Sequence, residues 1–588
     1  MKTNKIKDNI HGYIYFSKLE GLYLSHPLVL RLHHVRQNGA AFLTYPSIRV
    51  HRYEHSIGAM HLAGELLLRA VRFSDDPTIY DTIRQLVEHI CGKTIGHIRS
   101  VLVRPSSNVL KDSLYHLHHL DDIKNDDTLA LLLMFQSVRV AMLVHDIGHP
   151  PFSHTTEMAL KQMGVRYADH ERVGLDLLAL INNDLERSAD SKDEYAFSTF
   201  IADLVRAIVD KEDPAYPLVQ GIATIVSGDV DADRLDYVQR DALSGGLSTN
   251  SYDVGRLYDA LKLCSQEGPT GEKPPAAVMQ YHAAAMSTLE AFFSMRFHMY
   301  RWMLFHHSVI LQNMALVRIA HLIHQFGSTS QGDLAHACKD FVDLATNKAR
   351  RREYWRFTDA HMLDLMTRIY VAIETPTATD TATVRSLRRY LDTFLNRSKR
   401  HLVPFWKSPA DYAHFAEQVF ASSIDSASRS AVVRFNKVLR SRYNVIVETV
   451  RNEVASGASG TVKEMNNSDF YSFRFAAEIE KEINSRLAGH AVEVRAYYIA
   501  KFKATPTNML LKAGSEFRPL EVLSPTIASL ETAWDSLPHL WLFLERTRDF
   551  DGGVNSVESE RDGNQSTLQD VLPVVVEALT AFVQAIDS

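Results

Sequence analysis

Apolar residues recur at intervals of three and four along most of the chain, the spacing that places them on one face of an α-helix. The clearest segments run over His61–Val71, Thr128–Val144 and Ala284–Phe305. This pattern predicts a mainly α-helical protein. We expect a helical core over residues 1–350 and a C-terminal helical region over residues 351–588.

The pattern changes near the C-terminus. Val492–Ile499 and Met509–Leu511 are short apolar and β-branched runs between turn-forming residues, which is typical of strands. The sequence therefore predicts a short β element at about residues 489–520, with helix resuming near Ser524.

Composition narrows the class of protein. The 588 residues are 46% hydrophobic and 23% charged, as in an ordinary globular protein. The net charge of -6 argues against strong nonspecific affinity for nucleic acid, although a local basic groove stays open. Three widely spaced cysteines fit a reducing compartment. With no signal-peptide pattern at Met1–Asp8 and an apolar tail too short to span a bilayer, we expect a cytoplasmic protein without a membrane anchor.

One short segment carries the strongest chemical signal. The apolar run Val140–Val144 leads directly into His145-Asp146. An imidazole and a carboxylate beside a buried run are costly unless they are paired or bind a metal. His149 lies one helical turn beyond His145 and shares its face if the helix continues that far.

Two further segments supply the same residue types. His55 stands in Arg52-Tyr53-Glu54-His55, and Asp233 stands in Asp231-Ala232-Asp233-Arg234. Taken singly, His55 is a satisfied core histidine and Asp233 a partner of a nearby arginine. The ordered set of His, then His-Asp, then Asp resembles the HD-domain phosphohydrolases, and more narrowly the deoxynucleoside triphosphate (dNTP) triphosphohydrolases that include bacterial dGTPases.

The resemblance implies a metal centre in a helical HD-domain catalytic core. Its ligands would be His55, His145, Asp146 and Asp233. Nitrogen and carboxylate ligands suit a divalent metal such as Mg, Mn, Fe or Zn, so the sequence does not choose among them.

The resemblance also implies a reaction: attack at the α-phosphorus of a dNTP, releasing deoxynucleoside and inorganic triphosphate. His170 matches the acid that protonates the leaving oxygen, and His149 and His154 match histidines near the phosphates. Glu157 would orient a histidine. Histidine suits proton transfer because its ordinary pKa lies near neutrality. Taken alone, His170 is better explained as a helix-start residue beside Glu171.

Five residues match positions that bind the substrate. Arg52 and Arg234 would hold phosphate oxygens, for which the guanidinium offers a planar fork. Gln37 and Asp241 would hold the sugar 3′-hydroxyl, and Tyr237 would pack on the deoxyribose. Each arginine alone is also explained by an ordinary ion pair, and Tyr237 by a core position.

Several positions depart from the family pattern. Asn38 replaces an apolar residue beside Gln37, which leaves the sugar preference open. Ser25, Leu30 and His33 replace polar groups that read a guanine activator, so a nucleotide effector other than GTP is expected. The spacing between His55 and His145 indicates an insertion at about 74–126, read either as an inert surface segment or as a lid or oligomer contact.

The resulting hypothesis is a homo-oligomeric dNTP triphosphohydrolase (dimer, tetramer or hexamer) that serves dNTP pool control or antiviral defence. One alternative is an HD phosphohydrolase acting on a nucleoside monophosphate or cyclic nucleotide. Another is a nucleic-acid-binding module in which the HD site is secondary.

Overall fold

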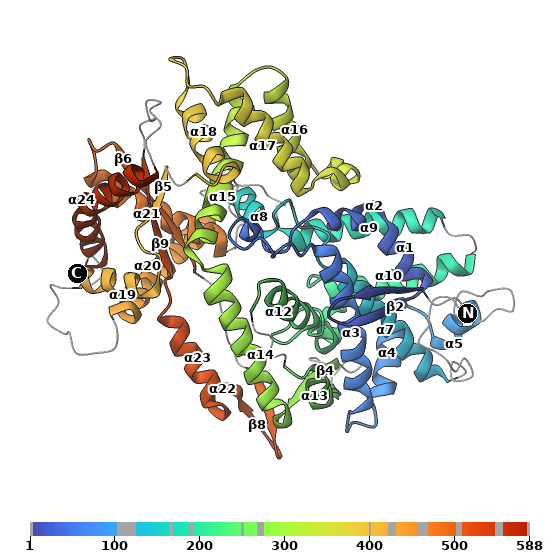
Figure 1. The fold of residues 1–588 in the computed structure, drawn as a ribbon. Helices are drawn as coiled ribbons and strands as arrows, with labels where there is room; N and C mark the ends of the chain where they lie inside the picture. Colours follow the sequence, from blue (N-terminus) through green and yellow to red (C-terminus); the bar gives the residue numbers. More distant parts are fainter. Residues whose placement is uncertain are drawn as a thin grey trace.

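The computed structural model shows a mainly helical chain, as the apolar spacing predicted (Figure 1). It describes residues 4–102, 125–163, 169–188, 192–247, 252–266, 276–398, 401–420, 431–455, 468–500, 509–546 and 557–584.

The elements up to residue 304 come first in chain order. They are β1 (Asn4–Asp8), β2 (Gly12–Phe16), α1 (Lys18–Ser25), α2 (Pro27–Leu30), η1 (Arg31–His34), η2 (Ala41–Leu43), α3 (Arg52–Arg72), α4 (Ile79–Cys91), α5 (Ile95–Leu102), α7 (Asp126–Val144), α8 (His154–Gln162), α9 (His170–Ser188), α10 (Lys192–Val209), α11 (Tyr216–Ala223), α12 (Ala232–Ser244), α13 (Val254–Ala260), β3 (Leu261–Gln266), β4 (Ala276–His282), η4 (Ala283–Ala285), α14 (Met286–Met299) and η5 (Tyr300–Leu304).

The remaining elements follow. They are α15 (His307–Thr329), α16 (Asp333–Thr346), η6 (Lys348–Arg356), α17 (Asp359–Ile373), α18 (Ala382–Leu395), β5 (Leu402–Pro404), α19 (Pro409–Val419), α20 (Ala431–Ala455), α21 (Ser468–Arg486), β6 (Val492–Tyr498), β7 (Leu510–Ala513), β8 (Glu516–Pro519), α22 (Leu520–Leu523), α23 (Pro525–Asp535), β9 (Leu540–Arg546) and α24 (Val557–Gln584).

Helix α7 is the centre of the N-terminal core. Asn125 caps it by accepting a hydrogen bond from the Asp127 amide, and almost every side chain from Leu129 to Val144 is buried. It packs against α3, α4 and α10. Its buried Arg139 donates to Glu20 at 2.6 Å, which neutralises the charge that this arginine brings into the packing.

The expected insertion begins with a core helix. Helix α4 packs on α7 through wholly buried Ile83 and Leu86, and α5 adds buried Ile98. This part is therefore not a surface appendage, contrary to the inert-segment reading. Residues 103–124 of the insertion lie outside the described residues.

The β element predicted at 489–520 is present as β6, β7 and β8, but it is divided between two sheets. One sheet has the order β5-β9-β6, and the other the order β3-β4-β7-β8, in which β4 and β7 are parallel. An N-terminal hairpin pairs β1 with β2. The strands β1–β5 and β9 were not predicted, because short strands in helix-rich surroundings carry little periodic signal.

Two described helices are long and apolar enough to cross a membrane by length and composition. Asp126–Val144 is 83% buried within the protein, whereas the window Thr567–Gln584 is 28% buried. In the second helix the buried residues Val571, Val575 and Leu579 form one stripe, and α24 packs against α21 and α19. The expectation that this apolar tail is too short to span a bilayer was therefore wrong by length and composition, although its buried stripe is that of a packed amphipathic helix.

Candidate metal centre and active site

Three side chains from separate elements converge beside the end of α7. His55 comes from the first turn of α3, His145 follows α7, and Asp233 lies in the first turn of α12. His55 Nε2 lies 3.0 Å and His145 Nε2 3.7 Å from Asp233 Oδ1. Their ligand atoms all lie within 4.8 Å of one another, so this group is able to hold a metal ion.

The Nδ1 atom of each of the two imidazoles already has a hydrogen-bond partner. His55 Nδ1 is hydrogen-bonded to Asp236 Oδ2 at 2.8 Å, and His145 Nδ1 to the Met142 carbonyl at 2.6 Å. Both Nε2 atoms are buried and have no hydrogen bond among the described residues. Outer partners that orient a ligating imidazole in this way are typical of metal sites. The two orphaned nitrogens beside carboxylates therefore fit a metal.

Asp236 organises the far side of His55. It accepts from His11 Nε2 at 2.7 Å and from both Nε and Nη2 of Arg240 at 2.8 Å. A Cβ on Gly58 would stand 2.1 Å from Asp236 Oδ1, so only glycine allows α3 to approach α12 this closely. Arg240 and the other contacts hold the pKa of Asp236 well below its usual range, against burial, which would raise it.

Asp146 lies beside the three converging ligands. Its Oδ1 is 3.3 Å from His145 Nε2, and its Oδ2 is 3.7 Å from His55 Nε2. Oδ2 also accepts a short hydrogen bond from Arg52, whose Nε donates to Ser153 at 2.6 Å. The structure therefore brings all four predicted ligands together, with Asp146 shared between the metal group and Arg52.

The chain leaves the helical path directly after α7. Helix α7 ends at Val144, so His149 does not continue a helical face with His145. Phe152 and Ser153 adopt positive φ of 55° and 56°, a region rare for residues other than glycine. Pro150 and Pro151 keep the helix from resuming at His149, because the residue before a proline is disfavoured in α conformation.

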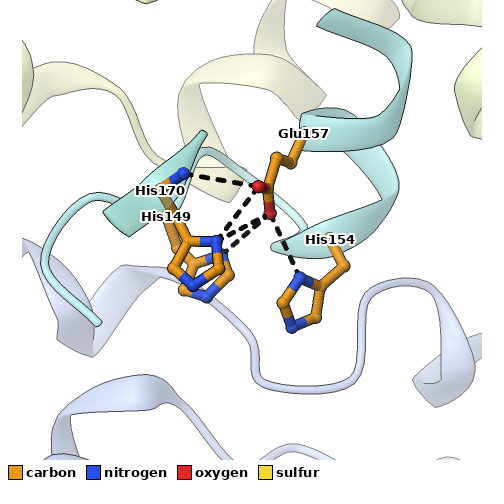
Figure 2. Close-up of side chains that lie close together, drawn as sticks. All are labelled: His149, His154, Glu157 and His170. Carbon is orange, nitrogen blue, oxygen red and sulfur yellow. Dashed lines mark hydrogen bonds and ion pairs between the residues drawn. The ribbon is translucent and has the colours of Figure 1, made fainter. Parts of the chain in front are cut away.

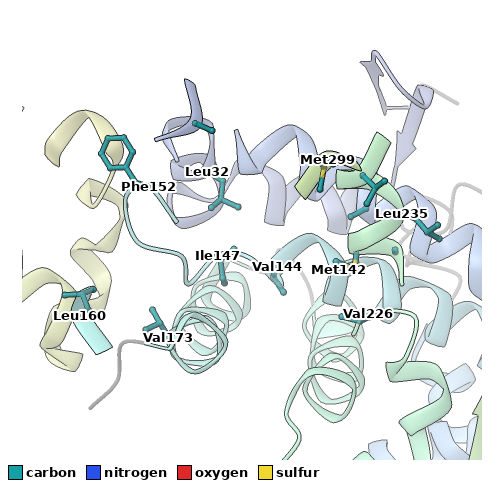
Figure 3. Close-up of a cluster of buried hydrophobic side chains, with 14 of the residues drawn as sticks. Leu32, Met142, Val144, Ile147, Phe152, Leu160, Val173, Val226, Leu235 and Met299 are labelled. Atoms are coloured by element: carbon teal, nitrogen blue, oxygen red, sulfur yellow. The ribbon is translucent and has the colours of Figure 1, made fainter. Parts of the chain in front are cut away.

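Three side chains from distant segments hold this loop. Arg31 donates to the carbonyls of Ile147 at 2.6 Å and His149 at 2.8 Å, and the Tyr354 hydroxyl donates to the Gly148 carbonyl at 3.0 Å. Asp359 accepts from the Phe152 amide at 2.7 Å. Ile147 of the loop and Val173 of α9 belong to a cluster of buried apolar side chains (Figure 3).

The loop continues into a second cluster, formed by His149, His154, Glu157 and His170 (Figure 2). Glu157, at the start of α8, accepts from His154 Nδ1 at 3.1 Å and from His170 Nδ1 at 3.0 Å. The backbone amide of His170 and the Lys161 ammonium also donate to it, at 3.3 and 2.5 Å. These donors satisfy the carboxylate, so hydrogen bonding accounts for this cluster without a second metal.

The surroundings in this cluster shift the pKa values of two of its histidines in opposite directions. Burial, then the Arg52 charge, hold the pKa of His149 well below its ordinary value. Burial also acts to lower the pKa of His170, but the Glu157 carboxylate overcomes it and raises that pKa. His170 is thus the member suited to carry a proton near neutral pH.

A cavity of about 510 Å³ joins both clusters. All five residues predicted to bind substrate line it: Gln37, Arg52, Arg234, Tyr237 and Asp241. Arg52 pairs with Asp146, and Arg234 pairs with Asp231 and with the Gly228 carbonyl, so both arginines already have anionic or carbonyl partners. A phosphate would have to compete with these partners or share them.

Other lining residues were missed by the sequence argument. Arg296 of α14, Lys211 and Tyr497 of β6 face the same cavity. No local motif marks them, because they come from segments far from the HD stretch. The outer partners Asp236 and Arg31 were also missed, although Asp236 follows Asp233 by one helical turn, the spacing that places both on one face.

The residues at the expected activator position have ordinary surroundings. Ser25 donates to the Leu22 carbonyl, Leu30 is 40% exposed, and His33 stacks on Tyr53 with centroids 3.6 Å apart. A second cavity of about 500 Å³ lies next to this segment, lined by His26, Pro27, Leu28, Leu180, Asp184, Arg352 and Trp355.

Fold and site together define a helical protein with a group of His and Asp side chains able to hold a metal. No protein-family model matches the chain. A deoxynucleoside triphosphate triphosphohydrolase SAMHD1 homologue of Dictyostelium discoideum is 25% identical over 268 residues, 45% of this chain and 41% of that protein. A putative HD domain-containing protein of Acanthamoeba polyphaga mimivirus is 22% identical over 260 residues, 44% of this chain and 45% of that protein.

The solved structure of a phosphohydrolase from Bacteroides thetaiotaomicron has the same fold, with a TM-score of 0.51 and 16% identity over 92% of this chain and 100% of that chain. The chain spans 34% to 64% of the length of the curated relatives it matches. These similarities support an HD-domain phosphohydrolase family for this chain.

Proposed function

We propose that this protein hydrolyses dNTPs to deoxynucleoside and inorganic triphosphate. The observation that carries the proposal is the pair of orphaned, buried Nε2 atoms of His55 and His145, which meet Asp233 and Asp146 at one end of a cavity. His149, His154 and His170 line the same cavity, and Glu157 holds His154 and His170 from behind. A metal group and a proton-carrying group facing one substrate-sized space suit metal-assisted hydrolysis of a phosphate ester.

His55, His145, Asp146 and Asp233 would hold a divalent metal. When bound, it supplies a Lewis acid that polarises the phosphoryl group and lowers the pKa of water. Arg52 lies between Asp146 and the loop at Ser153, where it can place positive charge at the α-phosphate. Arg234 would contact the remaining phosphates.

His170 would act as the general acid. When water attacks the α-phosphorus, the bond to the nucleoside 5′-oxygen breaks, and that oxygen takes a proton from the imidazole. Glu157 holds His170 Nδ1, which leaves Nε2 as the nitrogen that can deliver the proton. His149 and His154 would bind phosphate oxygens beside it.

The sugar would lie among Gln37, Tyr237 and Asp241. Tyr237 offers an aromatic face to the ring, and Asp241 is almost completely buried at the cavity wall. Carboxyl and amide oxygens at such a wall can accept hydrogen bonds from a 3′-hydroxyl.

We further propose a cytoplasmic homo-oligomer controlled by a nucleotide effector other than GTP. Leu30 and the stacked His33 offer little to a guanine edge, whereas the second cavity places Arg352 and Trp355 beside the same segment. The proposed role is control of dNTP pools or antiviral defence. Both roles use the same reaction.

The decisive experiment is product identification. The metal-loaded protein is incubated with each dNTP and NTP, alone and in pairs, and the products are separated by chromatography. Deoxynucleoside plus triphosphate is the expected result. Orthophosphate as the first product, or turnover of monophosphates or cyclic nucleotides alone, would contradict the proposal.

A further inference from the structure

One wall of the catalytic cavity holds three buried polar atoms whose hydrogen bonding is incomplete: Gln37 Oε1, Asn38 Nδ2 and Asp241 Oδ1. All three side chains line the cavity. The Asn38 amide interacts with the Asp241 carboxyl, which occupies at most one of its two N–H protons. Buried polar groups normally have all their partners, so this wall indicates a place for a polar ligand.

The backbone around Asn38 fixes the position of its amide. The Gln37 amide donates to the Val50 carbonyl at 3.0 Å, and the Ala41 amide donates to the Asn38 carbonyl at 3.0 Å. Gly39 has a φ of +51°, and a Cβ there would stand 2.8 Å from Thr155 Oγ1. Asn38 therefore cannot turn from the cavity without rearranging this packed segment.

The kinds of atom define the ligand. Asn38 Nδ2 donates hydrogen bonds, whereas Gln37 Oε1 and the Asp241 carboxylate accept them. A hydroxyl can do both, but one hydroxyl has a single proton to donate. Two acceptors and one donor on one wall are therefore matched by two neighbouring hydroxyls, each donating to one oxygen while one of them accepts from Asn38.

We propose that this wall binds the 2′,3′-diol of ribose, with Asn38 as the specificity-determining residue, so that ribonucleoside triphosphates are substrates alongside dNTPs. This inference rests on the proposed function and widens its substrate class. An apolar side chain at position 38 would strip water from a 2′-hydroxyl without replacing its hydrogen bond. Asn38 removes that penalty, and with a deoxynucleotide a water molecule takes the place of the second hydroxyl.

The test compares sugars on one base. kcat/KM is measured for ATP and dATP with the wild type, with Asn38→Leu, which keeps the side-chain size, and with Asn38→Ala. The wild type should hydrolyse both nucleotides. Both variants should lower the ATP to dATP ratio by about 10-fold or more, because the buried hydroxyl loses its partner. The matched control is Asn396→Leu, the same change at an exposed site after α18, which should leave the ratio unchanged.

The outcomes separate the two proposals. If dATP is hydrolysed and the ratio stays within about twofold in both variants, the role of Asn38 is wrong. If neither nucleotide yields triphosphate, the proposed function fails, and equilibrium binding of adenosine and 2′-deoxyadenosine decides the subsite. There, adenosine affinity should fall selectively in the variants, and equal affinities throughout would overturn the inference. If Asn38→Leu does not fold, Asn38→Ala carries the comparison.

Discussion

The imidazole of His149 lies flat on that of His170, with ring centroids 3.9 Å apart and ring planes 13° apart. Burial and Arg52 favour the neutral form of His149, while Glu157 favours the charged form of His170. Opposite tendencies allow close stacking because two imidazolium ions at this distance would repel. Pairs of groups whose surroundings separate their pKa values are typical of acid–base sites.

The first prediction concerns this pair. His170→Asn should lower kcat by about 100- to 10,000-fold, the usual contribution of a general acid. Glu157→Gln should move the alkaline limb of the pH–rate profile to lower pH. The sign follows from the raised pKa of His170: its proton is present below that pKa and lost above it, and the neutral amide no longer supports it. An unmoved limb in Glu157→Gln would rule out His170 as the acid.

The second prediction concerns the metal. Replacing His145 and Asp146 together by Ala should abolish both bound metal and hydrolysis, since two of four ligands are lost. Elemental analysis of the purified variant checks the first part. Full metal retention in this double variant would contradict the assignment of His145 and Asp146 as metal ligands.

The outer partner Asp236 offers a third, graded test. Asp236→Asn keeps the shape but weakens the support of His55 Nδ1, so metal affinity should fall by about 10- to 100-fold. Titration with a competing chelator measures this. Asp253→Asn, at the exposed N-cap of α13, is a control that should leave the affinity unchanged. Equal affinities for wild type and Asp236→Asn would show that Asp236 does not support the site.

A fourth prediction concerns stability and pH. Burial raises the pKa of Asp241 to about 7, above its ordinary value of about 3.9 in an unfolded chain. The stabilisation that the protonated Asp241 carboxyl gives the folded state is therefore fully present below about pH 4 and is lost as the pH rises through 7. Asp241→Asn cannot ionise, so its stability relative to the wild type should increase between pH 5 and pH 8, by on the order of 1–4 kcal/mol. Urea unfolding of both proteins at the two pH values gives this difference, and a pH-independent difference would contradict the assignment.

The fifth prediction tests the close approach of the loop to α9. A Cβ on Gly148 would stand 2.0 Å from the His170 carbonyl oxygen, so Gly148→Ala should destabilise the fold by about 1–3 kcal/mol. Gly96, in α5, has open space around its Cβ position. Gly96→Ala should be neutral or stabilising by up to about 1 kcal/mol, because alanine is the better helix former. Equal unfolding free energies for the two variants would disprove the packing argument.

The parts of the site that could be predicted from sequence share one property: the signal is local. His145 and Asp146 stand directly after an apolar run, and α7 has an unbroken buried pattern. The helix ends at Val144, so the condition under which His149 would share a helical face with His145 is not met. Whether His55 and Asp233 ligate a metal stays a prediction, although the structure places them beside His145.

The remainder depends on contacts that no spacing encodes. Arg31 reaches the loop from an N-terminal 3₁₀ turn, and β4 pairs with β7 across more than 200 residues. Tyr497 of β6 lines the cavity, whereas the next residue of the strand, Tyr498, faces the opposite side. Such contacts form only when segments that are far apart in the sequence pack together.

The hydrogen bonds that hold the loop after α7 also limit where the chain can be truncated. Tyr354 and Asp359 stand beyond residue 350, yet they hold the backbone at Gly148 and Phe152. An expression fragment ending at residue 350 would keep every proposed metal ligand and lose both anchors. Such a fragment should bind metal poorly despite its complete ligand set, so the two halves have to be inherited and engineered as one unit.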